Sequence, residues 1–246
     1  MSAERREAVR FVALAAREIA NGDVCFVGIG VPSLAAMAAK RHHAPNAVLI
    51  YESGAVDADP PIPPLSTGSP TVMARTAMAT SCLGVFAMLQ QGRIDRGLLS
   101  AAQIDRHGNL NSTSLARPGK PPLRLVGSGG AHDIAVLAND LVILMPHEPR
   151  RFVECVDHVT SPGIRPAGKT RGGGPSAVIT PRGRFTCAEG ELTLDALAPG
   201  QTAEAATDGF AWPVPRTQPL ATLPPIDREL WATCEALLDA WGREAA

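Results

Sequence analysis

The N-terminal part of the chain alternates between two hydrophobic periods, which predicts a helix followed by a strand–helix–strand unit. Residues 3–20 carry apolar side chains at helical spacing and end at Asn21-Gly22, a helix stop. Short apolar runs at 24–27 and 47–51 predict buried strands on either side of a small-residue helix at 33–41. This unit spans about 28 residues, close to the length of a parallel βαβ crossover.

The rest of the chain shows a similar succession, in which a glycine loop again separates a strand from a small-residue helix. The further predictions are strands at 98–101, 124–126 and 141–145, a glycine loop at 127–130, a helix at 131–139, a loop at 160–176, a hairpin over 177–187 and a C-terminal helix from about 226. No domain boundary is visible. We therefore expect an α/β protein with a single domain over residues 1–246.

Glu52 is the first candidate for chemistry, because it directly follows the predicted strand that ends at Tyr51. Parallel strands end at one edge of a sheet, so Glu52 and the turn Gly28–Pro32 are expected to lie side by side where open α/β sheets bind ligands. A carboxylate there is partly desolvated yet reachable, which suits a nucleophile or a proton carrier. The alternative is a strand-terminal glutamate that caps a neighbouring backbone group.

Two glycine loops are the second candidate. The turn Gly28–Pro32 lacks the third glycine of a dinucleotide fingerprint, but it leaves backbone N–H groups free at a helix start, where anionic oxygen can bind. Its alternative is an ordinary tight turn. Gly127–Gly130 supplies a second such cluster. Together with Glu52, the loops fit a covalent acyl mechanism in which Glu52 attacks a thioester carbonyl and N–H groups hold the oxyanion.

The composition narrows the function classes. The chain has 246 residues, of which 45% are hydrophobic, 19% charged and 4% aromatic, with a net charge of −1. These values allow a sizeable core and argue against nucleic acid or an acidic membrane surface as partner. No charge-free span and no secretory pattern is visible. Five widely spaced cysteines without a C-x-x-C pair favour reduced thiols in a cytoplasm and no metal site.

The remaining polar residues give weaker signals. His147 lies beside Glu148 and Arg150-Arg151 and is reachable by a ligand, but a surface role is the simpler interpretation. Asp57 and Asp59 are near enough to Glu52 in sequence for an acid/base pair. His42, His43 and His158 lack a partner at metal-ligand or triad spacing, and His107 lies in a predicted turn.

Five stretches identify a family. They are GIGVP at the first glycine turn, YESGAVD around Glu52, AQIDRHGNLNSTS, VGSGGAHDIA at the second glycine loop, and PHEPRRFVECVDHVTSPG. They run in family order from about residue 20 to 165, and a late TDGF segment and the C-terminal helix fit more loosely. With these stretches the chain resembles the β subunit of class I CoA-transferases, most closely the glutaconate CoA-transferase type. The resemblance implies an open, mostly parallel sheet with helices on both faces, a three-layer α/β/α fold.

The resemblance also implies a mechanism. The catalytic glutamate of the family falls on Glu52, which would form an acyl–glutamyl anhydride and then a glutamyl–CoA thioester in ping-pong transfer from an acyl-CoA to a free carboxylic acid. CoA would be a substrate, with no tightly bound cofactor. The partner would be a homologous α subunit in a heterodimer or higher heteromer, and short dicarboxylates are the expected acids. The amides that hold the oxyanion or CoA would come from the two glycine loops, at Gly28, Gly30, Val31, Gly127, Gly129 and Gly130.

Two alternatives stay open at this point. The chain could be a CoA-thioester hydrolase, or another lyase or decarboxylase on the same scaffold, because water exclusion depends on the partner subunit and loops. It could also be a non-catalytic ligand-binding subunit, although Glu52 with both glycine loops argues against this. The loop after Gly163 departs from the family: it is shorter than in the glutaconate type and carries Arg165, Lys169 and Arg171. This departure bears on the substrate more than on the reaction.

Overall fold

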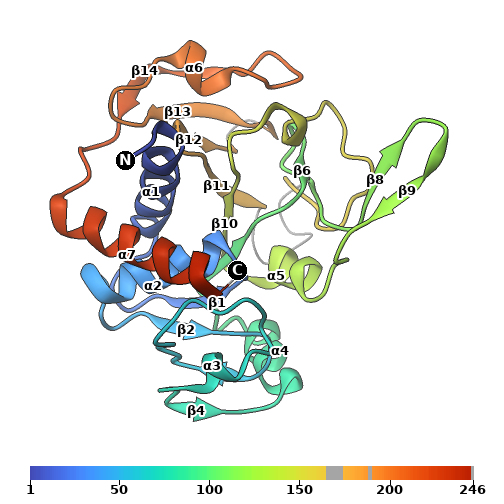
Figure 1. Ribbon diagram of the computed structural model, residues 1–246. Coiled ribbons are helices and arrows are strands. Elements are labelled where there is room, and N and C mark those ends of the chain that lie inside the picture. Colours follow the sequence, from blue (N-terminus) through green and yellow to red (C-terminus); the bar gives the residue numbers. More distant parts are fainter. Residues whose placement is uncertain (165–173, 188–189, 245–246) are drawn as a thin grey trace. The chain divides into compact units, whose positions relative to one another are not determined.

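The computed structural model describes residues 1–164, 174–187 and 190–244, which form two compact units (Figure 1). Unit 1 comprises residues 1–100 and 225–246, and unit 2 comprises residues 101–224. The expectation of one domain over residues 1–246 stays a prediction. Three basic residues of the loop predicted at 160–176 lie outside the described residues, namely Arg165, Lys169 and Arg171.

Unit 1 contains five strands around a parallel centre. In spatial order they are β5 (Arg96–Leu99), β1 (Val24–Val27), β2 (Val48–Ile50), β3 (Ala55–Val56) and β4 (Met78–Ala79). Strand β1 pairs in parallel with both β2 and β5, as the crossover pattern predicts. Strands β3 and β4 extend this parallel centre in antiparallel orientation. The buried side chains of β1 and β2, with Phe26 and Leu49 among them, belong to the core of this unit, to which α1 and α2 also contribute.

Unit 1 has five helices within its described residues. They are α1 (Ala3–Ala16), α2 (Val31–His42), α3 (Pro70–Met73), α4 (Cys82–Gln90) and α7 (Arg228–Glu244). Helices α1, α2 and α7 contact one another, and α2 also contacts β1. From α4, the ring of Phe86 packs 5.6 Å from that of Phe26 in β1. The C-terminal helix has the predicted apolar face, with Leu230, Cys234 and Leu237 buried. Strands alternating with helices in this way confirm the α/β class.

Unit 2 has a five-stranded sheet of mixed direction. Its order is β14 (Arg216–Thr222), β13 (Thr193–Leu197), β12 (Gly183–Thr186), β11 (Pro175–Ile179) and β10 (Asp140–Leu144). The β10–β11 and β13–β14 pairs are parallel, and the pairs between them are antiparallel. The predicted hairpin is β11–β12, closed where Thr180 N donates to Gly183 O at 2.9 Å. The helical segments of unit 2 are α5 (Ala131–Leu137), η1 (Pro149–Arg151) and α6 (Ala203–Thr207).

One predicted strand is wrong. Residues 124–126 do not form a core strand: β9 (Lys120–Arg124) ends there and pairs with β8 (Ser114–Arg117) in a two-stranded ribbon (Figure 1). Strand β9 is exposed along its length and includes two prolines, which suit a ribbon edge and not a central strand. The loop 127–130 therefore follows a surface hairpin, and the second strand–loop–helix–strand succession is not a second parallel crossover. A further ribbon joins β6 (Gln103–Ile104) to β7 (Leu110–Asn111).

None of the helices within the described residues has the length and apolar content that crossing a bilayer requires. The five cysteines are free thiols. Across the described ranges, no three His, Cys, Asp or Glu side chains gather closely enough to hold a metal ion.

Candidate active site

Glu52 lies in a tight turn directly after β2, as the sequence predicts. Gly54 N donates to Tyr51 O at 2.9 Å, which closes a four-residue turn with Glu52 at its first corner. Tyr51 N donates to Ala55 O at 3.0 Å, so the chain folds straight back into β3. Tyr51 and Gly54 are buried, Glu52 is half-buried and Ser53 is exposed. The turn therefore lifts the Glu52 carboxylate from a buried strand to a reachable position.

The Glu52 carboxylate makes no hydrogen bond or ion pair with the described residues of unit 1, so the alternative in which it caps a neighbouring backbone group receives no support. The other nearby carboxylates are engaged. Asp57 pairs with Lys40, and Asp59 lies 3.8 Å from Arg75. The expected acid/base pair of Glu52 with one of these aspartates therefore has no support in the ion pairs of this unit.

Gly54 fixes the shape of this turn. Its φ of +111° is in the region that favours glycine. A Cβ atom at this position would lie 1.9 Å from Thr80 O, because Thr80 N donates to Gly54 O at 2.8 Å across the turn. Only glycine allows so close an approach. The chain next to β4 thus packs directly against the turn that carries Glu52.

The first glycine loop lies beside Glu52 at the same edge of the sheet. Phe26 of β1 pairs with Ile50 of β2, and Gly28 and Glu52 each follow two residues later. Gly28 N donates to Leu98 O at 3.1 Å, and a Cβ on Gly28 would lie 2.9 Å from that oxygen. The parallel register thus brings together the two features that the sequence placed at this edge.

The loop leads directly into α2, so the N-terminus of this helix lies at the same edge of the sheet. Gly30, with a φ of +83°, precedes the first helical residue, Val31, and accepts at its carbonyl from Leu34 N at 3.0 Å. The first N–H groups of a helix have no intrahelical partner and carry the positive end of its dipole. Pro32 contributes no N–H, so the donors at this start are few and fixed in place. Such a start can stabilise an oxyanion.

A buried pair that the sequence did not reveal connects α2 to the Glu52 turn. Ser33 Oγ lies 2.7 Å from Tyr51 Oη, and both side chains are buried. Burial raises the pKa of Tyr51 to about 12, against the lowering effect of its bond to Ser33. The pair ties the first turn of α2 to the residue before Glu52. A hydroxyl in the first helical turn and a tyrosine closing an apolar run were the only signals for it.

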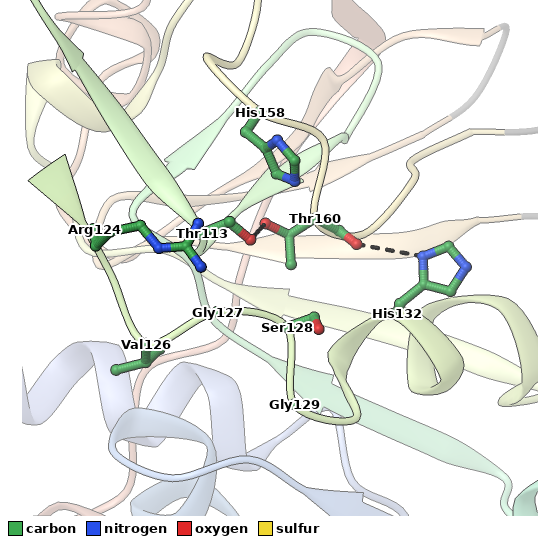
Figure 2. Close-up of a pocket in the computed structure, with 9 residues that line it drawn as sticks. All are labelled: Thr113, Arg124, Val126, Gly127, Ser128, Gly129, His132, His158 and Thr160. Atoms are coloured by element: carbon green, nitrogen blue, oxygen red, sulfur yellow. Dashed lines mark hydrogen bonds between the residues drawn. The ribbon is translucent and has the colours of Figure 1, made fainter. Parts of the chain in front are cut away.

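The second glycine loop lies in unit 2, where it borders a pocket of about 530 Å³. Figure 2 shows the lining residues: Thr113, Arg124, Val126, Gly127, Ser128, Gly129, His132, His158 and Thr160. Gly127 and Gly129 have positive φ values of +93° and +45°, which glycine adopts without strain. Gly130, by contrast, has a φ of −84° and needs no glycine on backbone grounds. It directly precedes α5.

Hydroxyl groups and backbone amides hold the pocket wall together. Thr113 Oγ1 lies 2.8 Å from Thr160 Oγ1, which also accepts from Ser112 N at 2.9 Å. Ser112 Oγ donates to Gly127 O at 3.0 Å and so fixes the start of the glycine loop. His132 Nδ1 donates to Thr160 O at 3.3 Å. The pocket is thus a bonded assembly of three distant chain segments.

The polar residues of the AQIDRHGNLNSTS stretch build the scaffold behind this pocket. Asn111 is fully buried and donates from Nδ2 to Gln103 Oε1 at 2.7 Å. Gln103 Nε2 donates in turn to Asp157 Oδ2 at 2.9 Å. Asp105 accepts from His107 N and Asn109 N, both at 3.0 Å, and holds the turn. These groups are occupied by each other, which indicates a structural role.

The histidine and arginines near residue 150 are structural as well. His147 Nε2 donates to Asp208 O at 2.9 Å, and its ring lies 5.6 Å from that of Phe152. Both Arg150 and Arg151 pair with Glu148. Partial burial raises the pKa of Glu148, but the bonds from the two arginines outweigh it and hold the pKa below its usual value.

A parallel strand that delivers a carboxylate beside a glycine-rich helix start is an arrangement suited to covalent acyl chemistry on an α/β scaffold. Residues 9–180 match the sequence model of the family described as Coenzyme A transferase. The chain belongs to this family. Both the resemblance recognised in the sequence and the expectation of a CoA-transferase are thereby confirmed.

The individual relatives agree with this. The chain is 41% identical over 210 residues to the B-type subunit of the 3-oxoadipate CoA-transferase from Pseudomonas knackmussii, covering 81% of this chain and 80% of the relative. It is 38% identical over 180 residues to the B-type subunit of the glutaconate CoA-transferase from Acidaminococcus fermentans, covering 68% and 67%.

Solved structures confirm the CoA-transferase fold. The crystal structure of glutaconate CoA-transferase from Acidaminococcus fermentans matches with a TM-score of 0.80 at 30% identity, covering 93% of this chain and 91% of that one. The decarboxylase AibA/AibB matches with a TM-score of 0.81 at 22% identity, covering 97% of both chains, and is a likeness of fold alone.

Proposed function

We propose that this chain is the β-type subunit of an enzyme that moves CoA between an acyl-CoA and a free carboxylic acid, with Glu52 as its nucleophile. The position of Glu52 carries the proposal. Its carboxylate stands at the end of a buried parallel strand, half-buried and without a partner in the described part of unit 1. The start of α2 lies at the same edge. A partly desolvated, unpaired carboxylate is a better nucleophile than a solvated one.

The reaction proceeds through two covalent intermediates on Glu52. The carboxylate attacks the thioester carbonyl of the donor and the C–S bond breaks. CoA departs as its thiolate, and an acyl–glutamyl anhydride stays on the enzyme. The thiolate then attacks the glutamyl carbonyl, which releases the donor acid as its carboxylate and leaves a glutamyl–CoA thioester. An acceptor carboxylate repeats the two steps in reverse. No electron or net proton is exchanged, so CoA serves as a substrate and no tightly bound cofactor is required.

Each attack on a carbonyl creates an oxyanion that needs hydrogen-bond donors. We assign this role to backbone N–H groups of the two glycine loops, at Gly30 and Val31 and at Gly129 and Gly130. The expected contributions of Gly28 and Gly127 have no support, because Gly28 N donates to Leu98 O at 3.1 Å and Gly127 N donates to Ser112 O at 2.9 Å. The helix start at Val31 supports the first assignment, and the place of Gly129 in the pocket wall supports the second.

Short dicarboxylic acids are the proposed substrates. The two relatives described above are named for 3-oxoadipate and for glutaconate, which are both dicarboxylates. Relatives of lower identity are named for acetate (31%) and for succinyl-CoA with a 3-ketoacid (25%). Because the relatives of higher sequence identity are the ones named for dicarboxylates, we favour a dicarboxylate as the substrate.

The proposed partner is a homologous α subunit, and helix α4 supports one. Its nine residues are almost all apolar, yet only Val85 and Leu89 are buried, and Leu83 is 79% exposed. Met78 on the neighbouring edge strand β4 is also exposed. Apolar surface of this kind marks a contact with another protein. The free thiols of the chain fit a cytoplasmic enzyme.

The test is to co-purify the chain with a co-expressed α-type subunit and to supply an acyl-CoA with a panel of free acids. We expect ping-pong kinetics and an acceptor-dependent product. With donor alone, borohydride should reduce the glutamyl–CoA thioester, and peptide mass analysis should find the change at Glu52. Release of free CoA at the same rate with and without acceptor would identify a hydrolase instead. Modification of another residue would overturn the role of Glu52.

A further inference from the structure

The pocket of unit 2 has the lining of an anion site. Two of its lining residues, Arg124 and His158, carry nitrogen donors with no bond described above, and three carry hydroxyls, Thr113, Ser128 and Thr160. The third nitrogen-bearing residue, His132, uses its Nδ1 hydrogen on Thr160 O. Among the described residues, no aspartate or glutamate lines the pocket. A concave surface with donors on several sides and no carboxylate favours an anionic oxygen group as its ligand.

Arg124 is the one permanent charge among the described residues of this lining. It stands at the end of β9, and Figure 2 shows its guanidinium directed towards Thr113. Within the described ranges, its side chain has no hydrogen bond and no ion pair. The other arginine of the same hairpin differs: Arg117 donates from Nε and Nη2 to Pro121 O at 2.9 and 2.7 Å. The guanidinium of Arg124 thus keeps its planar fork available for a carboxylate or phosphate.

The threonine pair has one hydroxyl hydrogen to offer. Thr113 Oγ1 and Thr160 Oγ1 share one hydrogen across their 2.8 Å contact, so the other hydroxyl hydrogen is left to donate elsewhere. Ser112 N already satisfies an acceptor position on Thr160. An anionic oxygen group in the pocket can therefore accept one hydrogen bond from this hydroxyl and others from the guanidinium of Arg124.

His158 completes the arrangement at the rim. Figure 2 shows its ring extending towards the threonine pair. The backbone next to it is anchored, because Asp157 N donates to Gln103 Oε1 at 3.1 Å and Asp157 Oδ2 accepts from Gln103 Nε2 and Ala116 N, each at 2.9 Å. The donors around the pocket are therefore held on a rigid scaffold, as a specific site requires.

We propose that this pocket binds the distal carboxylate of the dicarboxylic acyl group, with Arg124 as its ion-pair partner and the threonine pair and His158 as further donors. The inference rests on the proposed function. The pocket borders Gly129, whose amide the proposed function assigns to the thioester oxygen, so a carboxylate a few carbons away along the acyl chain reaches the donors of the same pocket. The volume of about 530 Å³ also accommodates a short acyl chain. Arg124 is on this basis a specificity-determining residue.

A CoA phosphate would present the same anionic oxygen chemistry as the distal carboxylate. The two ligands are told apart by acyl-CoAs that differ only in whether the acyl chain ends in a carboxylate. The test uses the complex with its α-type subunit and compares glutaryl-CoA with pentanoyl-CoA, which have equal numbers of acyl carbons. Arg124→Gln should lower kcat/KM for glutaryl-CoA roughly 10- to 100-fold, the size of a lost charge-assisted hydrogen bond, and change that for pentanoyl-CoA little. Arg124→Lys should restore part of the loss. Arg117→Gln is the matched control and should leave both substrates unchanged.

Three results would overturn the inference. An equal loss for both acyl-CoAs would place a CoA phosphate at Arg124, no loss for either would leave the pocket without a role in binding, and dissociation of the complex would make Arg124 a subunit contact. Borohydride trapping at Glu52 in the same Arg124→Gln preparation keeps the two proposals apart. If Glu52 is trapped but the preference for glutaryl-CoA is retained, only the carboxylate site fails. If wild type is not trapped and transfers nothing, the proposed function itself fails.

Discussion

The hydroxyl oxygen of Ser33 lies 2.7 Å from the phenolic oxygen of Tyr51, and this buried pair joins the first turn of α2 to the residue before Glu52. The helix start and the carboxylate are thereby fixed relative to each other by a side-chain bond as well as by the sheet register. The positions of both groups depend on two residues that touch no substrate in the proposed reaction.

Removal of both hydroxyls should therefore cost less than the sum of the two single removals. Tyr51→Phe leaves Ser33 Oγ buried without its partner, and we expect a loss of about 1–3 kcal/mol in the free energy of unfolding. Ser33→Ala should behave similarly, while the double variant should lose less than the sum, because no polar group stays unpaired. Denaturant unfolding of the four proteins measures this coupling. Strict additivity would show that the two hydroxyls do not interact.

Tyr51 should also make stability depend on alkaline pH. Its pKa is about 12 in the folded chain against an ordinary value of 10.0, with burial as the main cause. Below pH 10 the phenol is neutral in both states and its contribution is fully present. As pH rises from 10 to 12, the unfolded state ionises first, so wild type should lose stability relative to Tyr51→Phe. Buried thiols contribute their own alkaline loss in both proteins, which the comparison cancels. Parallel stability curves would show that Tyr51 titrates normally.

Glu52→Ala should reduce kcat for CoA transfer by several orders of magnitude, because the group that carries both covalent intermediates is gone. CoA binding and complex assembly should change little, and calorimetry and gel filtration check these two controls. Glu52→Asp withdraws the carboxylate by one methylene, so transfer should fall sharply while the ratio of hydrolysis to transfer rises. Retention of a tenth of wild-type transfer by the alanine variant would rule out Glu52 as the nucleophile.

Gly54→Ala should destabilise the chain and reduce transfer together. The new Cβ would overlap Thr80 O, in addition to the strain of a φ of +111°. Gly22→Ala is the matched control, since Gly22 has a φ of +94° but no atom within 4 Å of the added Cβ. We expect a loss of about 1 kcal/mol for the control from backbone strain and clearly more for Gly54→Ala. Equal melting temperatures for the two variants would show that the contact with Thr80 is not restrictive.

The isolated chain should be inactive and prone to associate, because α4 exposes apolar side chains that the proposed α subunit covers. Leu83→Glu should weaken assembly with that subunit while leaving the circular dichroism spectrum of the chain unchanged. Sedimentation of the mixed subunits measures the complex. Full transferase activity from the chain alone would refute the two-subunit proposal, and unchanged assembly of the Leu83→Glu variant would move the contact away from α4.

The sequence predicted the Glu52 edge well because that edge follows from local pattern and one rule of topology. Two short apolar runs around a helix specify a parallel pair, and the parallel register then places Gly28 and Glu52 at one edge. Nothing further was needed from the rest of the chain. The family stretches were readable for the same reason, since they are contiguous.

The second site could not be predicted in the same way. The apolar residues in the run 124–126 suggest a core strand. In the structure this segment instead continues the β8–β9 ribbon, because its backbone is hydrogen-bonded to residues 112–113. The pocket draws its lining from three segments, at 113, 124–132 and 158–160, which only tertiary pairing brings together. Likewise, no sequence pattern shows that Asp57 is occupied by Lys40.

The contact between Gly54 and Thr80 has a consequence for protein engineering. A designer who wishes to graft this nucleophile onto another scaffold cannot transplant the seven residues YESGAVD alone, because the backbone at Thr80 forms the surface on which the turn rests. The smallest transferable module runs from β2 through β4 to the start of α4. Homologous recombination of related subunits should for the same reason place no crossover point between residues 54 and 80, unless both parents share the same close approach.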